Sequence, residues 1–394
     1  MNTSANAAAL AGALHFVPGN RAAPIVSSRY ALAAQILRGK PPQAAVQWLP
    51  KIYSLCGSAH AWSAQAAVDR ALQGWQKPVV NDTQVVDVPG IDLELETARE
   101  HVRRLFLDWP RLLLPQDGQA AYLNQLTELR YCPLFLADGR HLGVALDQWM
   151  VKQVYGQPLQ QWLAAWQQHP GNAMQAWLAN VNTLPAQCLS ACQVVAEPLQ
   201  LAMSALLPHA GQQDLLAWIR QGLSDPQFDR QPLWQGRPCE TGVMTRLSML
   251  SWVAQQQWNV WLRLGQRLAE LAGLVLKMQG QSANVAIQLD LDHGALSLDE
   301  GQGMSWCEMA RGLLVHWIRL EMLNEEVVIA DYRVIAPTEW NFHPQGGLAC
   351  HIANMRATIH ETGSTARQHY EREIAVLVAA FDPCVQYDVE WCDA

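Results

Sequence analysis

The sequence has few charged residues for its length and no block of basic ones. Only 16% of the 394 residues are charged, and the formal net charge is −8. A surface for nucleic acid or for anionic lipid needs clustered lysine and arginine, and this chain offers no such cluster. We therefore expect no nucleic acid and no membrane among its partners.

Long apolar runs are also missing. The longest, such as Leu271 to Leu276, are bounded by Glu270 and Lys277 and are far too short to cross a bilayer. The N-terminal segment has a modest apolar stretch with no basic residue before it, which makes a poor signal peptide. The nine cysteines are an odd number without framework spacing, which predicts mostly free thiols in a reducing cytoplasm.

Apolar residues, in contrast, are plentiful. Half of the chain is hydrophobic, and its 17 tryptophans predict large apolar contacts. Helical periodicity runs through most of the chain, and prolines cut the middle into helices of ordinary length. We expect one helix from Leu93 to Leu107, ended by Trp109-Pro110, and a longer one from Met244 to Met278.

Beyond Gly280 the period changes to that of strands. Val285–Leu291 alternates, and two β-like runs, 313–320 and 327–335, flank a hairpin signal at 324–326. The predicted fold is α+β: mainly α with a small β-sheet late in the chain. We expect a single domain over residues 1–394, in which the first 25 residues form a loose start or a strand.

The segment 51–72, KIYSLCGSAHAWSAQAAVDRAL, places Cys56 and His60 four residues apart at the start of an apolar helical pattern. Residues at this spacing share a helix face, so the thiol and the imidazole would point the same way. Taken alone, the pair is better explained as a packing cysteine and a satisfied core histidine. A nucleophile and base would lack an identifiable orienting residue, and a zinc site would lack a CxxC partner. Cys384, near the C-terminus, is by itself an ordinary cysteine.

Five short segments gain meaning from their order. They are KIYSLCGSAH at 51–60, PLWQGRPCETG at 232–242, EMARG at 308–312, APTEWN at 336–341 and DPCVQYDVE at 382–390. In this order they resemble motifs of the large subunit of [NiFe]-hydrogenase, among them R-I-C-G-x-C-x-x-x-H, E-A-P-R-G, V-P-S-T-W-N and D-P-C-x-x-C-x-x-H. The resemblance is closer to the HupK/HoxV-type relatives, which are accessory proteins of hydrogenase maturation.

The sequence departs from these motifs at a few positions. Tyr53 and Tyr387 stand where the family has the first cysteine of its first motif and the second cysteine of its last motif, and Glu390 replaces the final histidine. No R-I-E-G-H stretch occurs near the N-terminus, so a role that rests on its glutamate is not expected here.

The resemblance implies a metal site that is only half retained. A hydrogenase holds nickel and iron with four thiolates, and the iron also carries two cyanides and one carbon monoxide. By position, Cys56 matches a bridging ligand and Cys384 a nickel ligand, so two thiolates remain. They are too few for nickel and iron together but enough to hold an Fe(CN)2CO unit.

The resemblance also assigns the surroundings of this unit. Arg311 would lie beside the diatomic ligands, and Thr338 would hydrogen-bond a cyanide, since an anionic nitrogen in a dry pocket needs donors. His60 and Asp382 complete the residues expected at the cofactor.

The function that this resemblance implies is that of a scaffold rather than an enzyme. The protein would take the Fe(CN)2CO unit from assembly proteins of the HypC/HypD type. It would carry the unit transiently, without nickel, and hand it to a hydrogenase large-subunit precursor in the cytoplasm. The alternative is a metal-free docking or chaperone homologue of the large subunit. A working hydrogenase is disfavoured by Tyr53 and Tyr387.

Overall fold

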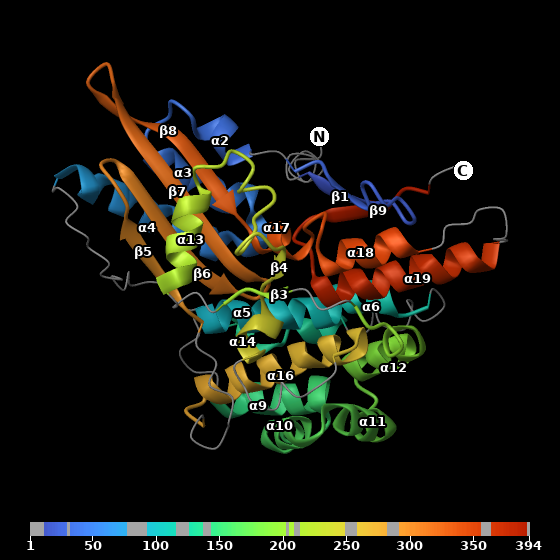
Figure 1. The fold of residues 1–394 in the computed structure, drawn as a ribbon. Coiled ribbons are helices and arrows are strands. Elements are labelled where there is room, and N and C mark those ends of the chain that lie inside the picture. Colours follow the sequence, from blue (N-terminus) through green and yellow to red (C-terminus); the bar gives the residue numbers. More distant parts are fainter. Residues whose placement is uncertain are drawn as a thin grey trace.

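Helices dominate the fold, and the sheets are small (Figure 1). The computed structural model describes residues 12–29, 32–76, 93–115, 126–136, 143–201, 205–208, 213–248, 258–281, 291–355 and 364–391. The predicted mainly α fold with a small late sheet is confirmed. The expected alternation at Val285–Leu291 lies mostly outside the described residues.

The largest sheet is antiparallel and lies late in the chain. Its four strands pair in the order β5 (His293–Ser297), β6 (Gln302–Met309), β7 (Gly312–Leu323) and β8 (Glu326–Ile335). Asn324 and Glu325 link β7 to β8, and both have a left-handed backbone, with φ of 49° and 66°. A two-residue hairpin with right-handed strand twist needs this conformation, so the hairpin predicted at 324–326 is confirmed.

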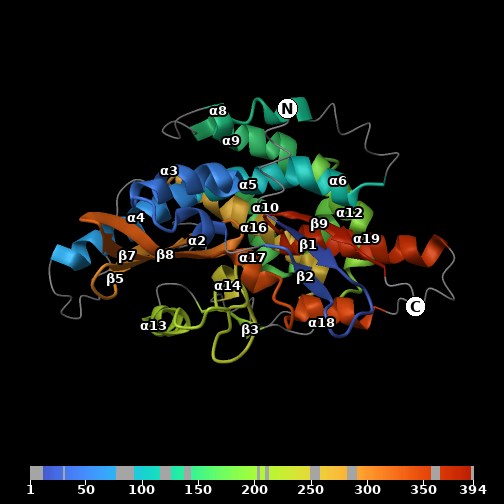
Figure 2. The same ribbon diagram turned by 90° about the horizontal axis from the view of Figure 1, so that it is seen from above.

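One face of this sheet is covered by helices from the N-terminal part of the chain (Figure 2). These are α2 (Leu32–Leu37), α3 (Gln43–Ile52) and α4 (Gly57–Gln76), with a single 3₁₀ turn, η1 (Ser54–Cys56), between the last two. Ala64, Ala67 and Ala71 are fully buried in the cluster that joins α4 to the sheet. Small side chains at helical spacing let the helix approach the strands closely. Helix α13 (Gln213–Gly222) lies on the opposite face.

The remaining helices form a layer around α16 (Val260–Met278), which is buried along most of its length and contacts α5, α10, α12 and α19. The helices of this layer are α5 (Leu93–Arg103), η2 (Arg104–Asp108), α6 (Trp109–Leu113), α8 (Pro133–Leu136), α9 (Gly143–Met150), η4 (Val151–Tyr155), α10 (Leu159–Gln168), α11 (Pro170–Asn180), α12 (Leu184–Ala196), α14 (Val243–Ser248), α18 (Gly347–Asn354) and α19 (Ser364–Phe381). None of the helices in the described ranges is long and apolar enough to cross a membrane.

Two predicted helix boundaries are wrong. The helix expected from Met244 to Met278 is not continuous, because Asn259 adopts an extended backbone and its side chain caps a new helix at Leu262 N. The helix that begins at Leu93 does not end at Trp109-Pro110. It continues through a π-helical turn into α6. Pro110 lies in the first turn of α6, where the backbone N–H that proline lacks would have no partner within the helix.

A small sheet joins the two ends of the described chain. Strand β1 (Ala13–Phe16) pairs antiparallel with β2 (Ile25–Ser27) and parallel with β9 (Gln386–Val389). The first residues therefore include strands, one of the two expected states. Two further short strands, β3 (Ala205–Leu206) and β4 (Cys239–Glu240), pair beside α17 (Pro337–Asn341).

We predict that Gly303→Ala destabilises the protein. A Cβ atom at this β6 position would lie 2.1 Å from the carbonyl oxygen of Ala67 and 2.6 Å from the backbone nitrogen of Ala71, so α4 must move away from the sheet. Overpacking of this kind costs about 1–3 kcal/mol or more. The measurement is the free energy of unfolding in denaturant.

Gly171→Ala is the matched control, since no atom lies within 4 Å of the added Cβ there. It should be neutral or stabilise the protein by up to about 1 kcal/mol. Equal effects of the two substitutions would show that α4 and β6 are not packed as closely as described.

Candidate metal-cofactor site

A pocket of about 870 Å³ lies where the two ends of the chain meet the sheet and the helical layer. Among its lining residues are five that the sequence predicted for the site: Cys56, His60, Arg311, Asp382 and Cys384. We call it the cysteine pocket. The structure thus brings residues from positions 56 to 384 to one cavity, and the sixth predicted residue, Thr338, reaches it by a contact with Cys384.

Cys56 is placed by the break between α3 and α4. Pro50 lies in the last turn of α3, and the chain leaves the helix at Tyr53, whose backbone is no longer helical. Gly57 starts α4 directly against Pro50, because an added Cβ would lie 3.0 Å from the Pro50 carbonyl oxygen. The Cys56 side chain is buried at the pocket wall as a result.

Cys384 is placed by the end of α19. Asp382 follows this helix in the left-handed conformation, with φ of 55°, and its backbone nitrogen donates to Val378 O at 2.9 Å. A left-handed residue after a helix reverses the direction of the chain, and Pro383 prevents further helix. Cys384 then sits between this turn and β9.

The sulfur of Cys384 has two side-chain partners. Thr338 Oγ1 lies 3.0 Å from it, and the Arg29 guanidinium donates to it at 3.1 Å. Arg29 also holds Glu339 at 2.7 Å. Burial alone would lower the pKa of Arg29, but the charges of Cys384 and Glu339 outweigh it and raise that pKa, so Arg29 stays a cation. The sulfur thus lies next to a fixed positive charge.

Arg29 is a site residue that the sequence did not predict. It lies in the short stretch after β2, where no family motif marks it. It reaches Cys384 only because β1 pairs with both β2 and β9. No local signal in the sequence could have revealed this pairing.

Arg311 stands at the tight turn between β6 and β7, where three of the sequence motifs meet. The backbone nitrogen of Thr241 donates to the side chain of Asn341 at 2.8 Å, and Asn341 Nδ2 donates to Arg311 O at 3.3 Å. Gly242 and Gly312 allow this approach, since a Cβ on Gly242 would lie 2.8 Å from Arg311 O. The turn is therefore fixed by its neighbours.

The Arg311 side chain is buried between two carboxylates. It lies 3.4 Å from Glu100 on α5 and 3.4 Å from Asp382. Burial favours its neutral form, but the charges of Asp382 and Glu100 raise its pKa. Arg311 thus presents a permanent cation at the wall of the cysteine pocket.

Asp382 is held by three arginines from three parts of the chain. Its carboxylate lies 2.6 Å from Arg104 Nε, 2.5 Å from Arg267 and 3.4 Å from Arg311. Burial would raise the pKa of Asp382, yet the three cations together hold it well below its usual value. This cluster, which we call the Asp382 cluster, ties α16, η2 and the β6–β7 turn to the end of α19.

His60 is part of a buried chain of rings. Its Nδ1 lies 2.9 Å from His316 Nε2, and His316 Nδ1 lies 2.7 Å from the Tyr332 hydroxyl. Burial and the neighbouring His316 charge lower the pKa of His60, and burial lowers that of His316 to about 3. Both imidazoles are therefore neutral near pH 7. His60 lines the cysteine pocket as a neutral polar group.

The two tyrosines at former cysteine positions both line the cysteine pocket. The Tyr53 ring stacks on His60 at 4.4 Å, and the Tyr387 ring packs against Phe16 at 5.6 Å. Burial raises the pKa of Tyr53 to about 12, and burial also raises that of Tyr387. Both phenols are neutral near pH 7 and make poor ligands for a soft metal.

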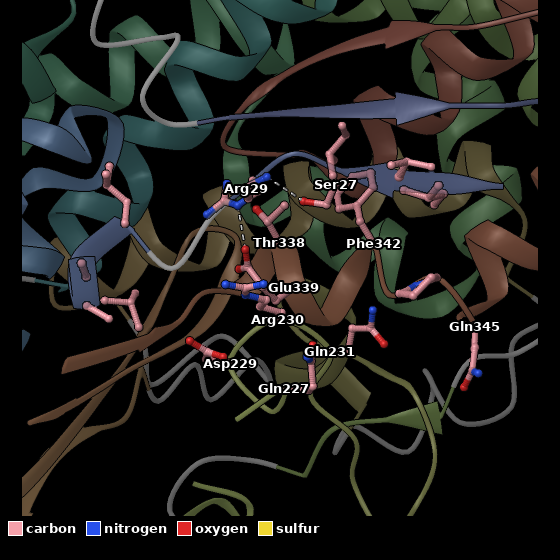
Figure 3. A pocket seen from close by; sticks show the side chains of 18 of the residues that line it. Ser27, Arg29, Gln227, Asp229, Arg230, Gln231, Thr338, Glu339, Phe342 and Gln345 are labelled. Atoms are coloured by element: carbon pink, nitrogen blue, oxygen red, sulfur yellow. Dashed lines mark hydrogen bonds and ion pairs between the residues drawn. The ribbon is translucent and has the colours of Figure 1, made fainter. Parts of the chain in front are cut away.

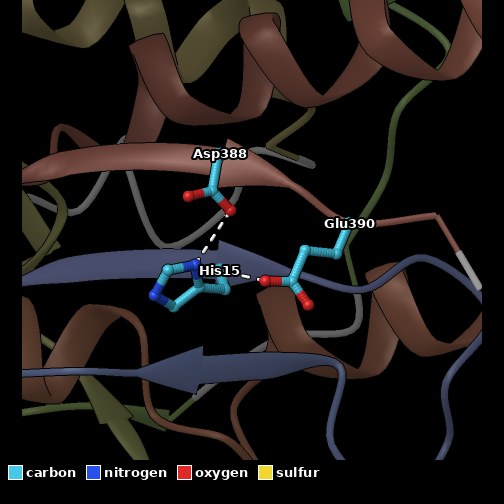
Figure 4. A group of neighbouring side chains, drawn as sticks. All are labelled: His15, Asp388 and Glu390. Carbon is cyan, nitrogen blue, oxygen red and sulfur yellow. Dashed lines mark hydrogen bonds and ion pairs between the residues drawn. The ribbon is translucent and has the colours of Figure 1, made fainter.

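The tail beyond Cys384 is fastened to β1 by an exposed cluster (Figure 4). His15 Nδ1 lies 2.9 Å from Asp388 and 3.6 Å from Glu390, the residue at the position of the family's final histidine. The ligand atoms of all three lie within 4.8 Å of one another. All three are partly exposed to solvent, and polar contacts of this kind at the surface add little to stability.

The donor set suits a soft metal with anionic ligands. Two thiols line the pocket, and burial together with the neighbouring Cys384 raises the pKa of Cys56. A bound metal would offset this cost of ionisation. Arg29, Arg311 and Thr338 carry hydrogen-bond donors at or beside this pocket. The residues present therefore fit an iron unit with cyanide ligands and fewer protein thiolates than a four-thiolate centre has.

We predict that Asp382→Ala strongly destabilises the protein, because it leaves three arginines at the cluster without their carboxylate. Breaking a buried ion pair from one side costs about 3–5 kcal/mol. Asp388→Ala, on the same tail, removes an exposed carboxylate whose side chain is 55% accessible, and should cost less than about 1 kcal/mol. The measurement is the unfolding free energy. A loss at Asp382 no larger than that at Asp388 would contradict the role given to the cluster.

A second prediction concerns Glu96 on α5, whose Oε2 is buried without a hydrogen-bond partner among the described residues. Burial, with the charge of Glu100, raises the pKa of Glu96 from 4.5 to about 7. Between these pH values the folded state binds a proton that the unfolded state has lost. The stability of the protein therefore falls as the pH rises through this window and is constant above it.

Glu96→Gln removes this penalty. The variant should match the wild type near about pH 5 and exceed it at about pH 8 by roughly 1–3 kcal/mol. Glu94→Gln is the control on the same helix, because Glu94 is paired with Lys277 near the surface. The difference in unfolding free energy between Glu94→Gln and the wild type should not increase with pH. If the stability difference between Glu96→Gln and the wild type is the same at both pH values, the pKa of Glu96 is not raised in the folded protein.

Comparison with known proteins finds relatives that span most of the chain. The chain is 38% identical to the hydrogenase expression/formation protein HoxV of Cupriavidus necator, over 98% of this chain and 97% of HoxV. It is 26% identical to the hydrogenase expression/formation protein HupK of Bradyrhizobium diazoefficiens, over 91% and 90% of the two chains. Residues 240–389 match the nickel-dependent hydrogenase family.

A solved structure shows the same fold. The Ni-Fe-Se hydrogenase of D. vulgaris Hildenborough in the reduced state aligns with a TM-score of 0.50, 14% identity and coverage of 91% of this chain and 92% of that one. The fold is thus that of a hydrogenase large subunit, as the resemblance of the motifs predicted. HoxV and HupK, which this chain matches over 97% and 90% of their lengths, are both named as hydrogenase expression/formation proteins, and the chain belongs to the HoxV/HupK family of such proteins.

Proposed function

We propose that this protein is a scaffold of hydrogenase maturation that carries an Fe(CN)2CO unit and passes it to a hydrogenase large-subunit precursor. The observation that carries the proposal is the pairing of two thiols with two tyrosines around one pocket. Cys56 and Cys384 line the cysteine pocket, and Tyr53 and Tyr387 line it too. Two thiolates suffice for iron that brings its own diatomic ligands, and neutral phenols offer nickel no replacement ligands.

The pocket wall supports this cargo. The Arg29 and Thr338 groups that contact the Cys384 sulfur are donors, and Arg311 adds a second buried cation. Cyanide nitrogen atoms accept charge-assisted hydrogen bonds from such groups. Cys56 would bind as a thiolate once the metal replaces its proton, and the neutral His60 ring lines the same pocket without adding a charge.

Two ligands from the protein also suit a carrier. A carrier must release its cargo, and the acceptor's larger thiolate set would then bind the unit more tightly. Leu55 and Leu107, which line the cysteine pocket, are 48% and 41% exposed. Apolar side chains at a pocket mouth are suited to contact with another protein. Under this proposal, the unit arrives from HypC/HypD-type assembly proteins and the protein catalyses no reaction itself.

The test is an infrared spectrum and a metal analysis of protein purified from a host that has the maturation machinery. We expect cyanide and carbonyl bands, iron without nickel, and loss of the bands in Cys56→Ser and in Cys384→Ser. Cys350→Ser, at an exposed cysteine, is the control and should keep them. Iron-free wild-type protein from a competent host would refute the carrier function and favour a metal-free docking homologue.

A further inference from the structure

A second pocket of about 550 Å³ adjoins the cysteine pocket (Figure 3). Arg29 and Tyr53 line both pockets, so they form the wall between them. We call this second cavity the outer pocket. Its polar lining includes Gln227, Asp229 and Glu339, and none of the family motifs accounts for the first two. The volume is in the range of pockets that hold a small organic ligand rather than a bare ion.

Two carboxylates of the outer pocket have an oxygen without a partner. Asp229 Oδ1 and Glu339 Oε2 are both buried, and neither has a hydrogen-bond partner among the described residues. Asp229 as a whole is only 9% exposed. Glu339 is already bound on its other oxygen, where Arg29 Nε lies 2.7 Å away. A buried acceptor without a donor is costly, so both oxygens favour a ligand that donates hydrogen bonds.

The charge balance points to a cationic donor. Burial raises the pKa values of Asp229 and Glu339. The charge of Asp331 adds to the increase at Asp229, and the charge of Asp229 adds to the increase at Glu339. Arg29 already binds Glu339 Oε1 and donates to Cys384, so it does not also donate to Glu339 Oε2 and Asp229 Oδ1. Arg333 and the exposed Arg230, which lines the pocket, both attract Asp229, but among the described residues neither forms an ion pair with it. An added cation would stabilise both carboxylates in their charged form.

We infer that the outer pocket binds a guanidinium or ammonium group between Asp229 and Glu339. The group can come from a small free amine or from an arginine or lysine side chain of a partner protein. Binding needs no displacement of Arg29, because the unpartnered oxygen of Glu339 is the one that Arg29 leaves open. The site is independent of the iron cargo, although Arg29 connects Glu339 directly to Cys384.

The test is titration calorimetry of the full chain, without iron, at a pH where carboxylates are charged. The probes are Nα-acetyl-arginine amide, its uncharged isostere Nα-acetyl-citrulline amide, and methylguanidinium. We expect the arginine probe to bind and the citrulline probe not to bind. Tighter binding of the arginine probe than of methylguanidinium identifies a protein side chain as the ligand, and equal binding identifies a small free cation.

Four variants decide whether the binding occurs at this site. Glu339→Gln and Asp229→Asn should each weaken binding about tenfold or more, since each removes a charge-assisted hydrogen bond. Arg230→Gln removes the exposed one of the two lining arginines and should bind the probe as tightly or more tightly. Asp299→Asn, at a carboxylate 61% exposed outside the pocket, is the matched control.

Three outcomes would overturn the inference: equal binding of the citrulline probe, unchanged binding in both carboxylate variants, or weaker binding of the arginine probe in Arg230→Gln, which would show that the probe does not bind through its charge at this site. A crystal of the wild-type protein soaked with the arginine probe gives a test that does not depend on how the variants fold. The guanidinium should lie within hydrogen-bond distance of Glu339 Oε2 and Asp229 Oδ1. An empty outer pocket in such a crystal would equally reject the site.

Discussion

The geometry of the cysteine pocket depends on one carboxylate that is shared by three arginines. Asp382 adopts a left-handed backbone at the end of α19, a conformation that costs an aspartate some strain. Its ion pairs with Arg104, Arg267 and Arg311 compensate for this strain and join three separate parts of the chain. The same ion pairs keep Arg311 charged and pointed at the pocket. A pocket built from distant segments needs such a common anchor, because its lining residues come from several separate elements.

The sequence contained enough information to predict most of this arrangement. The order of five short motifs implied the fold, and the motif residues Thr241, Arg311 and Asn341 do meet through hydrogen bonds. Cys56 and Cys384 were expected in one pocket and line one pocket. Those predictions succeed because the residues of one motif form their contacts with residues of other motifs, so the motifs together specify how the segments pack. Hairpin and proline signals succeed for a simpler reason, since backbone conformation decides them locally.

The failures have a physical cause as well. Arg29 contacts Cys384 through the pairing of β1 with β9, a contact between residues more than 350 positions apart that no local pattern reveals. The break before α16 was missed because Asn259 reads as one polar residue in an apolar helical period, whereas its side chain caps a new helix. Of the three arginines around Asp382, Arg311 was predicted from its motif, but Arg104 and Arg267 were missed because each is ordinary within its own helix. Only the tertiary contacts give these residues their roles.

The position of Cys384 has a consequence for the way in which any cargo would leave. Immediately before it, Asp382 is anchored by three arginines, and shortly after it, the chain is paired to β1 over Gln386–Val389. A residue tethered on both sides by such short spans cannot swing outward with what it holds. Transfer would therefore require the acceptor to bring its own ligands to the pocket mouth, so that ligands are exchanged in place and the donor's tail remains stationary.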